Sequence, residues 1–391
     1  RSPYLAEAFE RFGIGVQTLR VGEYKSFTEI FTRSDMSPED REQREALLSG
    51  LWTEILASYA EDRTSTVATL QALSNERGFL DANEALAAGL VDRVAPLGDI
   101  IGELEERVGL GPRGNSFQQL SLQAYLDTTT PPANPLIESE ERIGVVYLDG
   151  SIVDGEGGPD VVGGDRFSRA LRRMRQDEGI KAAVLRIDSP GGSVFASEQI
   201  RQEAALLAQE VPVVVSMGGV AASGGYWIAT AADTILAQPT TITGSIGVFG
   251  LLFNFEAFAN EYGVFFDGVQ TGPFAGLGSP TRPLGDEQLA RLQQQVERIY
   301  DDFIDRVATA RDLPPARVRE IGEGRVWIAA QALDIGLIDG YGGLQDAIDA
   351  AAQRAGLDDY DLDEVPRRRD FLETLLEDLA APGSSPPVAR T

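Results

Sequence analysis

Short runs of apolar, often β-branched residues alternate with amphipathic stretches between residues 143 and 250. A short apolar run bounded by glycine or polar residues is typical of a buried strand, whereas apolar residues three and four positions apart indicate a helix. The pattern predicts strands at 143–148, 182–187, 213–217 and 234–237, and helices at 165–176, at 195–209 and from Ser223 onward. Strands that alternate with helices favour parallel βαβ units, so we expect an α/β fold with parallel sheets.

Motifs in the first part of the chain occur again, in the same order, further along, which indicates a diverged internal repeat. The paired motifs are Ala8-Phe9 and Ala257-Phe258, Phe12-Gly13 and Tyr262-Gly263, 21–25 and 271–275, and the Ala-x-x-x-Gly-Leu-(Val/Ile)-Asp elements at 85–92 and 332–339. Both copies also carry a long amphipathic pattern, which predicts helices at 38–62 and 286–311. The predicted strands at 143–237 precede only the second copy, so we expect the first repeat to be truncated at its N-terminus.

These patterns predict four segments along the chain. The C-terminal half of the first repeat is expected at 1–111, a linker at 112–141, the second repeat at 142–352 and a C-terminal tail at 353–391. Proline, threonine and asparagine are frequent around Pro131–Pro135, which is typical of a linker. The tail is expected to hold a short helix near 369–380 before a flexible Pro/Ser stretch.

The composition excludes several kinds of catalytic site. The chain has no cysteine and no histidine, so disulfides, thiolate nucleophiles, Ser-His pairs and the usual metal ligands are excluded, and we expect no metal and no cofactor. Of the 34 basic residues, all but Lys25 and Lys181 are arginines. Arginine stays protonated in proteins, whereas a buried lysine can lose its proton. These two lysines are therefore the basic side chains that could serve as a general base.

Charge and hydropathy limit the partners of the chain. With 61 acidic residues and a formal net charge of -27, the protein is not expected to bind nucleic acid. No apolar run reaches the roughly eighteen residues that a membrane-spanning helix needs. The sequence itself therefore predicts no membrane-spanning helix.

Ser223 follows a predicted strand and small residues, and a helix is expected to begin there. The amides at a helix N-terminus and the helix dipole stabilise negative charge, as an acyl-transfer enzyme requires beside its nucleophile. The alternative is a structural corner in which Ser223 only caps the helix.

A second glycine turn, Ser189–Ser193, follows the neighbouring predicted strand. Glycine lets the backbone approach a ligand closely and direct an amide toward it. Because such turns meet at the carboxyl edge of a parallel sheet, amides from this turn and from Gly224 could form an oxyanion hole. Taken alone, this turn can equally be structural.

Four stretches together resemble a known family. They are Asp188–Val194 (Asp-Ser-Pro-Gly-Gly-Ser-Val), Ser216–Trp227, Thr243–Gly247 (Thr-Gly-Ser-Ile-Gly), and Val21–Ser26 with Asp35–Pro38. They are similar to signal peptide peptidase A in its long, tandem-repeat form, also called protease IV, whose fold is related to Clp protease and crotonase. The resemblance extends from about residue 3 to about residue 350. It implies a serine endopeptidase that cleaves residual signal peptides and other apolar peptides through an acyl-enzyme.

The resemblance also implies roles for individual residues. Ser223 matches the nucleophile and Lys25 the general base, while Ser245 matches the serine that orients the lysine amine. Gly191 or Gly192, together with Gly224, would supply the oxyanion amides. The position that corresponds to Lys25 in the second copy is Ala275, so the Ser/Lys dyad must form between the two repeats.

The proposed chemistry requires an unusual environment for Lys25. With a pKa of about 10.4, only about one lysine in a thousand is neutral near pH 7. Burial away from carboxylates could lower this pKa by about 3 units, and the neutral amine could then take the Ser223 proton. The alternative for Lys25 is a surface lysine beside a tyrosine. We interpret Lys181 as a solvated charge and assign no proton transfer to Asp188.

A substrate pocket lined by Tyr226, Trp227, Ile246 and Val248 would suit apolar side chains, although these residues can equally be core. Two other functions share the fold: a crotonase-type thioester enzyme, which needs acidic residues that the two glycine turns lack, and a catalytically inactive scaffold or chaperone. The family resemblance further implies peptide substrates, a ring-like homotetramer, and a membrane anchor upstream of this sequence. It places the catalytic domains outside the cytoplasm, at a bacterial inner membrane.

Overall fold

The computed structural model describes residues 2–63, 65–114, 116–122, 124–125 and 140–366. The chain divides into two compact units, one of residues 1–47 with 140–391 and one of residues 48–139. Residues 1–47 therefore pack with the second repeat, and the predicted first segment 1–111 does not form one unit. The predicted tail helix at 369–380 and most of the predicted linker lie outside the described residues.

The larger unit is built on a sheet with the strand order β10-β8-β6-β5-β2-β12, in which β7 pairs with β6 and β11 with β7. Its strands are β2 (Arg142–Asp149), β5 (Ile180–Ser189), β6 (Val213–Ala222), β7 (Thr234–Ala237), β8 (Ile242–Gly244), β10 (Val326–Ile328), β11 (Gly340–Tyr341) and β12 (Asp361–Val365). All pairs are parallel except β10 with β8. The α/β fold with a parallel sheet is confirmed, and the four predicted strands lie within β2, β5, β6 and β7.

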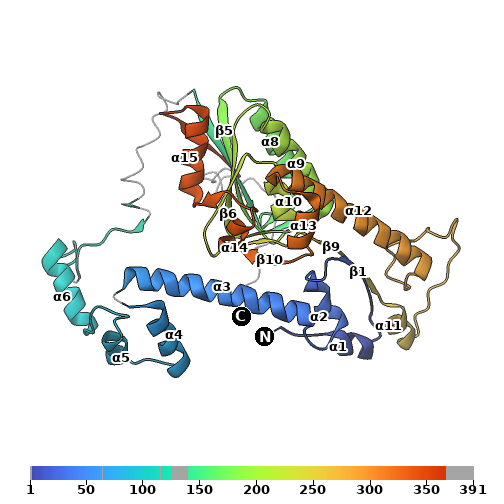
Figure 1. Cartoon of the computed structure of the whole chain (residues 1–391), viewed down its shortest axis with the longest axis horizontal. Coiled ribbons are helices and arrows are strands. Elements are labelled where there is room, and N and C mark those ends of the chain that lie inside the picture. Colours follow the sequence, from blue (N-terminus) through green and yellow to red (C-terminus); the bar gives the residue numbers. More distant parts are fainter. Residues whose placement is uncertain (1, 64, 115, 123, 126–139, 367–391) are drawn as a thin grey trace. The chain divides into compact units, whose positions relative to one another are not determined.

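Helices cover both faces of this sheet, with α15 on one side and α8 and α9 on the other (Figure 1). They are α8 (Gly164–Arg175), α9 (Val194–Leu207), α10 (Gly224–Ala229), α12 (Asp286–Arg311), α13 (Pro315–Ile321), α14 (Ala329–Asp334) and α15 (Leu344–Ala355). Side chains alternate between the two faces of a strand, so neighbours in β5 enter different cores. Val184 belongs to one buried cluster together with Ile348 of α15, whereas Leu185 belongs to the other together with Ile200 of α9.

The end of the predicted second repeat needs a correction. Residues 361–365, which we expected in a separate tail, form β12 and pair in parallel with β2 from Arg142 to Val146. The boundary predicted at residue 352 is therefore wrong, because an edge strand of the main sheet comes from beyond it. The acidic composition of β12 hid it from a search for apolar runs.

A second, antiparallel ribbon joins the two copies of the repeat. Strand β1 (Gly15–Val21) pairs with β9 (Val248–Asn254) along their whole length, and the two strands lie side by side in Figure 1. Around β1 lie α1 (Ala6–Arg11), the 3-10 turn η1 (Ser26–Thr28) and α2 (Glu29–Thr32). The ribbon places the residues that follow β1 beside the main sheet of the second repeat.

The other helices and strands are divided between the two units. They are α3 (Pro38–Asp62), which spans the boundary between the units, α4 (Val67–Glu76), α5 (Ala82–Ala87) and α6 (Leu97–Val108) of the smaller unit, and β3 (Ser151–Val153), β4 (Val161–Gly163) and α11 (Glu256–Glu261) of the larger one. The helices predicted at 38–62 and 286–311 match α3 and α12. Among the described residues, no helix combines the length and the apolarity needed to cross a bilayer.

Candidate active site

Lys25 lies in a tight turn directly after β1. Gly22 has a φ of +103°, and the Tyr24 amide donates a hydrogen bond of 2.9 Å to the carbonyl of Glu323. Gly324 lies against the lysine so closely that a Cβ at this position would come within 2.7 Å of the Lys25 Cβ. Only a glycine fits at 324, because its φ of +75° and this contact both disfavour a side chain. The turn thus directs the Lys25 side chain into the interior of the larger unit.

Ser223 lies at the corner between β6 and α10, as expected. Its φ of 53° and ψ of −117° lie outside the regions that residues other than glycine normally occupy. The corner is held by two hydrogen bonds, from the Ser223 amide to the Gly244 carbonyl at 2.9 Å and from the Trp227 amide to the Ser223 carbonyl at 2.8 Å. The Ser223 side chain does not cap the helix. This excludes the structural alternative in which Ser223 is only an N-cap.

Lys25, Ser223 and Ser245 meet within one chain. The Lys25 Nζ lies 3.0 Å from the Ser223 Oγ, 2.9 Å from the Ser245 Oγ and 2.9 Å from the Ser245 carbonyl oxygen. Ser245 is held in a left-handed conformation, with a φ of 52°, and its amide donates to the Arg325 carbonyl. The three residues come from β1, β6 and β8 or the turns that follow them.

Burial lowers the pKa of Lys25 from 10.5 to about 7, and no carboxylate opposes this shift. The side chain is 5% exposed. The ammonium form loses its hydration inside the protein, so the neutral amine is favoured. The expected burial of Lys25 is confirmed, and the surface-lysine alternative is wrong. Near neutral pH, a large fraction of Lys25 is unprotonated and able to accept a proton from Ser223.

The two glycine turns lie against each other at Ser223. The Gly191 amide donates to the Ser189 Oγ at 3.1 Å, whereas no hydrogen bond joins the Gly192 amide to another described residue. Gly224 is the first residue of α10, where an amide has no partner within the helix. A Cβ on Gly191 would lie 2.8 Å from the Ser223 Cβ. Gly192 and Gly224 are therefore the better candidates for oxyanion donors, while Gly191 permits the close approach of the turns.

A cavity of about 70 Å³ adjoins Ser223. Its other lining residues are Gly192, Val194, Ser197, Gly224, Trp227, Gly247, Val248, Phe249 and Phe303. Trp227 and Val248 line it as expected, but Tyr226 and Ile246 do not. Tyr226 is fully buried and donates to the Leu337 carbonyl at 2.7 Å, and Ile246 belongs to the core. The prediction of these two as pocket residues is wrong, because their side chains face the core rather than the serine.

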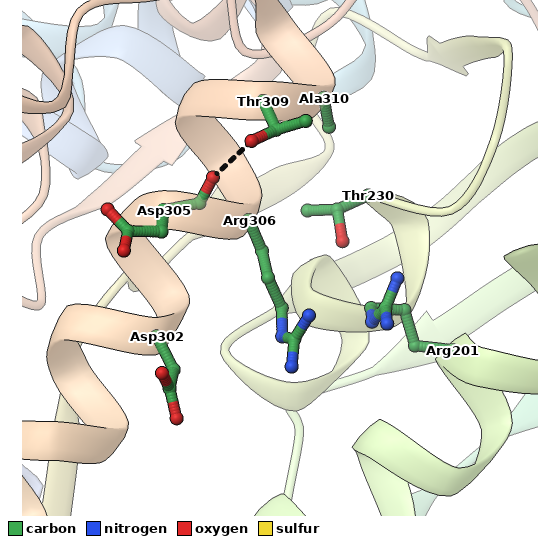
Figure 2. Close-up of a pocket in the computed structure, with 7 residues that line it drawn as sticks. All are labelled: Arg201, Thr230, Asp302, Asp305, Arg306, Thr309 and Ala310. Carbon is green, nitrogen blue, oxygen red and sulfur yellow. Dashed lines mark hydrogen bonds between the residues drawn. The ribbon is translucent and has the colours of Figure 1, made fainter.

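A network of charged residues fixes the position of Trp227. Its Nε1 donates to Glu198 at 2.7 Å, and Arg306 binds Glu198 at 2.9 Å while its guanidinium lies over the indole ring. Beside this network is another cavity of about 270 Å³, where Arg201 and Arg306 extend from α9 and α12 (Figure 2). Neither Ser223 nor Trp227 lines this second cavity, which is therefore separate from the serine site.

Asp188 has a structural role, and Lys181 lies in a strand of the main sheet. Asp188 accepts hydrogen bonds from the amides of Gly219 and Val220, at 3.1 and 3.0 Å, and thereby fixes the approach of β6 to its corner. Lys181 is half-buried in β5, so it is less solvated than we expected. Among the residues that the structure describes, no group of acidic side chains could hold a metal ion.

Sequence reasoning missed several residues that line the serine cavity. Val194 and Ser197 come from α9, Phe303 comes from α12, Gly247 ends the Thr-Gly-Ser-Ile-Gly motif, and Phe249 follows it. Phe249 directly follows the predicted pocket residue Val248, and this position in the sequence is the only signal that could have suggested it. No local signal connects Phe303 to Ser223, because only the packing of α12 on α10 brings them together.

The model of Peptidase family S49 matches residues 1–111 and 205–358. The chain is 37% identical over 386 residues to "Protease 4" of Salmonella typhi, an alignment that covers 96% of this chain and 61% of that protein. This chain therefore belongs to peptidase family S49.

Two further relatives agree with this assignment. "Protease 4" of Haemophilus influenzae is 36% identical over 90% of this chain and 58% of its own length. "Serine protease SPPA, chloroplastic" of Arabidopsis thaliana is 31% identical over 91% of this chain and 53% of its own length. The chain thus spans between half and two thirds of the length of these three relatives.

Proposed function

We propose that this S49 family member is a serine peptidase in which Ser223 is the nucleophile and Lys25 the general base. The observation that carries the proposal is the 3.0 Å contact between the Ser223 Oγ and a buried lysine whose pKa is lowered to about 7. A nucleophile within hydrogen-bond reach of a base that is neutral at working pH is what covalent catalysis requires. The names of the relatives, which are proteases, support the same reaction.

The first half of the reaction forms an acyl-enzyme. The neutral Lys25 amine takes the proton of the Ser223 hydroxyl as the Oγ attacks the scissile carbonyl. The oxygen of the tetrahedral intermediate gains negative charge, which the amides of Gly192 and Gly224 stabilise. Protonated Lys25 then gives its proton to the leaving amine as the C–N bond breaks. The acyl group remains on Ser223.

The second half releases the acyl product. Water gives a proton to Lys25 and adds to the ester, and the proton returns to Ser223 as the C–O bond breaks. Throughout, Ser245 holds the lysine amine through its Oγ and its carbonyl, both at 2.9 Å. With these two acceptors occupied by N–H groups, the lone pair of the neutral amine is free to face Ser223. We therefore assign Ser245 an orienting role.

Apolar peptides are the proposed substrates, because Trp227, Val248, Phe249 and Phe303 give the cavity beside Ser223 apolar walls. Residual signal peptides are the class that the family resemblance implies. A homotetramer, a membrane anchor and an extracytoplasmic location remain predictions of that resemblance. A thioester enzyme is disfavoured, since neither glycine turn carries a glutamate.

A fluorophosphonate probe tests the proposal directly. The full chain should be labelled at Ser223, as mapped by peptide mass spectrometry, and Ser223→Ala should not be labelled. Lys25→Met should be labelled far more slowly at pH 8, because the serine then lacks its base. Ser216→Ala serves as a control, since Ser216 is buried in β6 and its Oγ accepts a hydrogen bond from Arg186, away from Ser223. If Ser223 is not labelled, the inactive scaffold is favoured, and equal labelling of Lys25→Met would contradict the role of Lys25 as the base.

A further inference from the structure

Five phenylalanines form one connected cluster beside the candidate active site. Their ring centroids lie 5.2 Å apart for Phe27 and Phe249, 5.8 Å for Phe27 and Phe31, 5.6 Å for Phe31 and Phe253, 6.1 Å for Phe9 and Phe31, and 6.0 Å for Phe9 and Phe253. The rings come from α1, η1, α2 and β9, so the cluster depends on the pairing of the two copies. We refer to these five residues as the phenylalanine surface.

The phenylalanine surface lies on the face of the β1–β9 ribbon that points away from the core. Side chains alternate along a strand. In β9, Val248 and Leu252 pack into the core of the larger unit, so Phe249 and Phe253 point to the opposite face. Phe27 is 54% exposed and Phe249 is 38% exposed. Apolar side chains that gather in this way on a surface, rather than singly, indicate a binding site.

This surface is continuous with the serine site at two points. Phe249 lines the same cavity as Ser223. Phe27 lies in η1, whose N-terminal flanking residue is Lys25. A polypeptide whose scissile bond lies at Ser223 would therefore pass onto the phenylalanine surface as it leaves the cavity.

We propose that the phenylalanine surface binds the apolar segment of an extended polypeptide substrate, some residues away from the bond that Ser223 attacks. This inference rests on the proposed function and names a second contact region for the same substrates. Alternate side chains of an extended strand lie about 6.6 Å apart on one face. The rings are spaced by 5.2 to 6.1 Å, so successive inward side chains of such a peptide each meet a phenyl ring.

The chemistry of the surface favours an apolar, uncharged segment. The five rings offer no hydrogen-bonding group, so affinity must come from removing apolar area from water. Arg20, the one charged residue of β1 and β9, is already paired with Glu29 at 3.2 Å. A peptide with an unbroken apolar stretch gains binding free energy at every ring that it covers. A peptide with polar residues in this stretch loses the hydration of those residues without gaining hydrogen bonds in return.

A direct binding measurement tests the surface without requiring turnover. The probe is a fluorescein-labelled Leu/Ala peptide of about ten residues with lysines at both ends, the length of the apolar core of a secretory signal peptide. Anisotropy is measured on the full chain carrying Ser223→Ala. Adding Phe27→Ser should raise the Kd about tenfold, as expected for the loss of one large apolar contact. Phe265→Ser is the matched control, because Phe265 is 75% exposed and outside the cluster, and it should leave the Kd unchanged.

Kinetics on the otherwise unmodified chain separates this inference from the proposed function. With Phe27→Ser, the ratio of kcat/KM for the long apolar peptide to kcat/KM for a dipeptide ester should fall about tenfold. Phe31→Leu, which keeps an apolar side chain at its position, provides a second variant that should lower the ratio in the same direction. An unchanged ratio and an unchanged Kd would overturn the inference even if the ester is hydrolysed.

Other outcomes are also decisive. If neither substrate is hydrolysed but Phe27→Ser still weakens peptide binding, the proposed function fails and the binding surface stands. If sedimentation velocity shows an oligomer that Phe27→Ser dissociates while the Kd for the peptide is unaffected, the surface is an interface between copies of the chain and the inference fails.

Discussion

Two stretches of this chain follow related motifs and have different structures. After Phe12-Gly13, residues 15–21 form β1, pair with β9 and lead to Lys25. After Tyr262-Gly263, residues 264–270 form no strand, and the position that corresponds to Lys25 is Ala275. Phe265 and Val269 in this second stretch are exposed, whereas Leu19 of β1 is buried.

The difference shows that pairing, rather than local sequence, decides which copy forms a strand. An extended segment needs a neighbour for its amides and carbonyls. Strand β9 pairs with β1, whereas among the described residues no strand pairs with 264–270. The paired copy can therefore hold a lysine at a fixed, buried position, and the other copy has no lysine to hold.

The largest effect is expected from removing the lysine. Lys25→Met should lower kcat/KM for an apolar peptide by about 10²–10⁴, the usual contribution of a general base. Adding Ala275→Lys to this variant should restore nothing, because residue 275 lies on an unpaired stretch outside the Ser223 cavity. The rates are measured with a fluorogenic peptide. Recovery of activity in the double variant would mean that the two copies are interchangeable.

A smaller but still large effect is expected from displacing the lysine. Gly324→Ala would place a Cβ within 2.7 Å of Lys25, so the turn must shift. A shift of about 1 Å in a catalytic group costs about 10² in rate. The matched control is Gly276→Ala, which has a similar φ of +82° but whose nearest neighbour is a flexible glutamine side chain at 3.2 Å. Peptidase assays should show a loss only at 324, and equal losses would attribute the effect to general strain.

The pH dependence should follow the lowered pKa of Lys25. Because the neutral amine is the active form, kcat/KM should rise with pH and reach half its plateau near pH 7. Ser245→Ala should reduce the plateau about tenfold, within the range of a lost positioning hydrogen bond. It should also move the midpoint to lower pH, since the ammonium form loses an acceptor. A midpoint that moves upward in pH–rate profiles would contradict the orienting role.

The last prediction concerns stability rather than activity, and it follows from the burial of the Lys25 amine. The folded state holds Lys25 at a pKa of about 7 against 10.5 in the unfolded chain, so the unfolded state binds more protons between these pH values. Stability of the wild-type chain should therefore rise with pH through this window, by up to about 5 kcal/mol. Lys25→Met should be stabilised most at pH 6 and least at pH 10.

Denaturant unfolding at both pH values measures this gain. Lys181→Met is the control, because that lysine is half-buried in β5 and outside the serine site. If Lys25→Met gains as much at pH 10 as at pH 6, protonation of the lysine is not the cause of the gain.

Much of the fold could be predicted because its signals are local. The apolar runs at 182–187 and 213–217 lie within β5 and β6, and the period of the apolar residues marks α12 from 286 to 311. Strand β12 could not be predicted in this way, since its acidic residues become a strand only by pairing with β2. Tyr226 and Ile246 cannot be distinguished from pocket residues for a related reason: an apolar residue next to a motif does not reveal which face it occupies.

The sequence by itself determined which residues could perform the chemistry. With no histidine, no cysteine and two lysines, it left Lys25 and Lys181 as candidate bases, and the motif around Ser223 identified a nucleophile. Only the tertiary structure decided that Lys25, 198 positions from Ser223, lies 3.0 Å from it, and that burial lowers its pKa to about 7. Residue type is a property of the chain, whereas distance and desolvation arise from the pairing of β1 with β9 and the packing that follows.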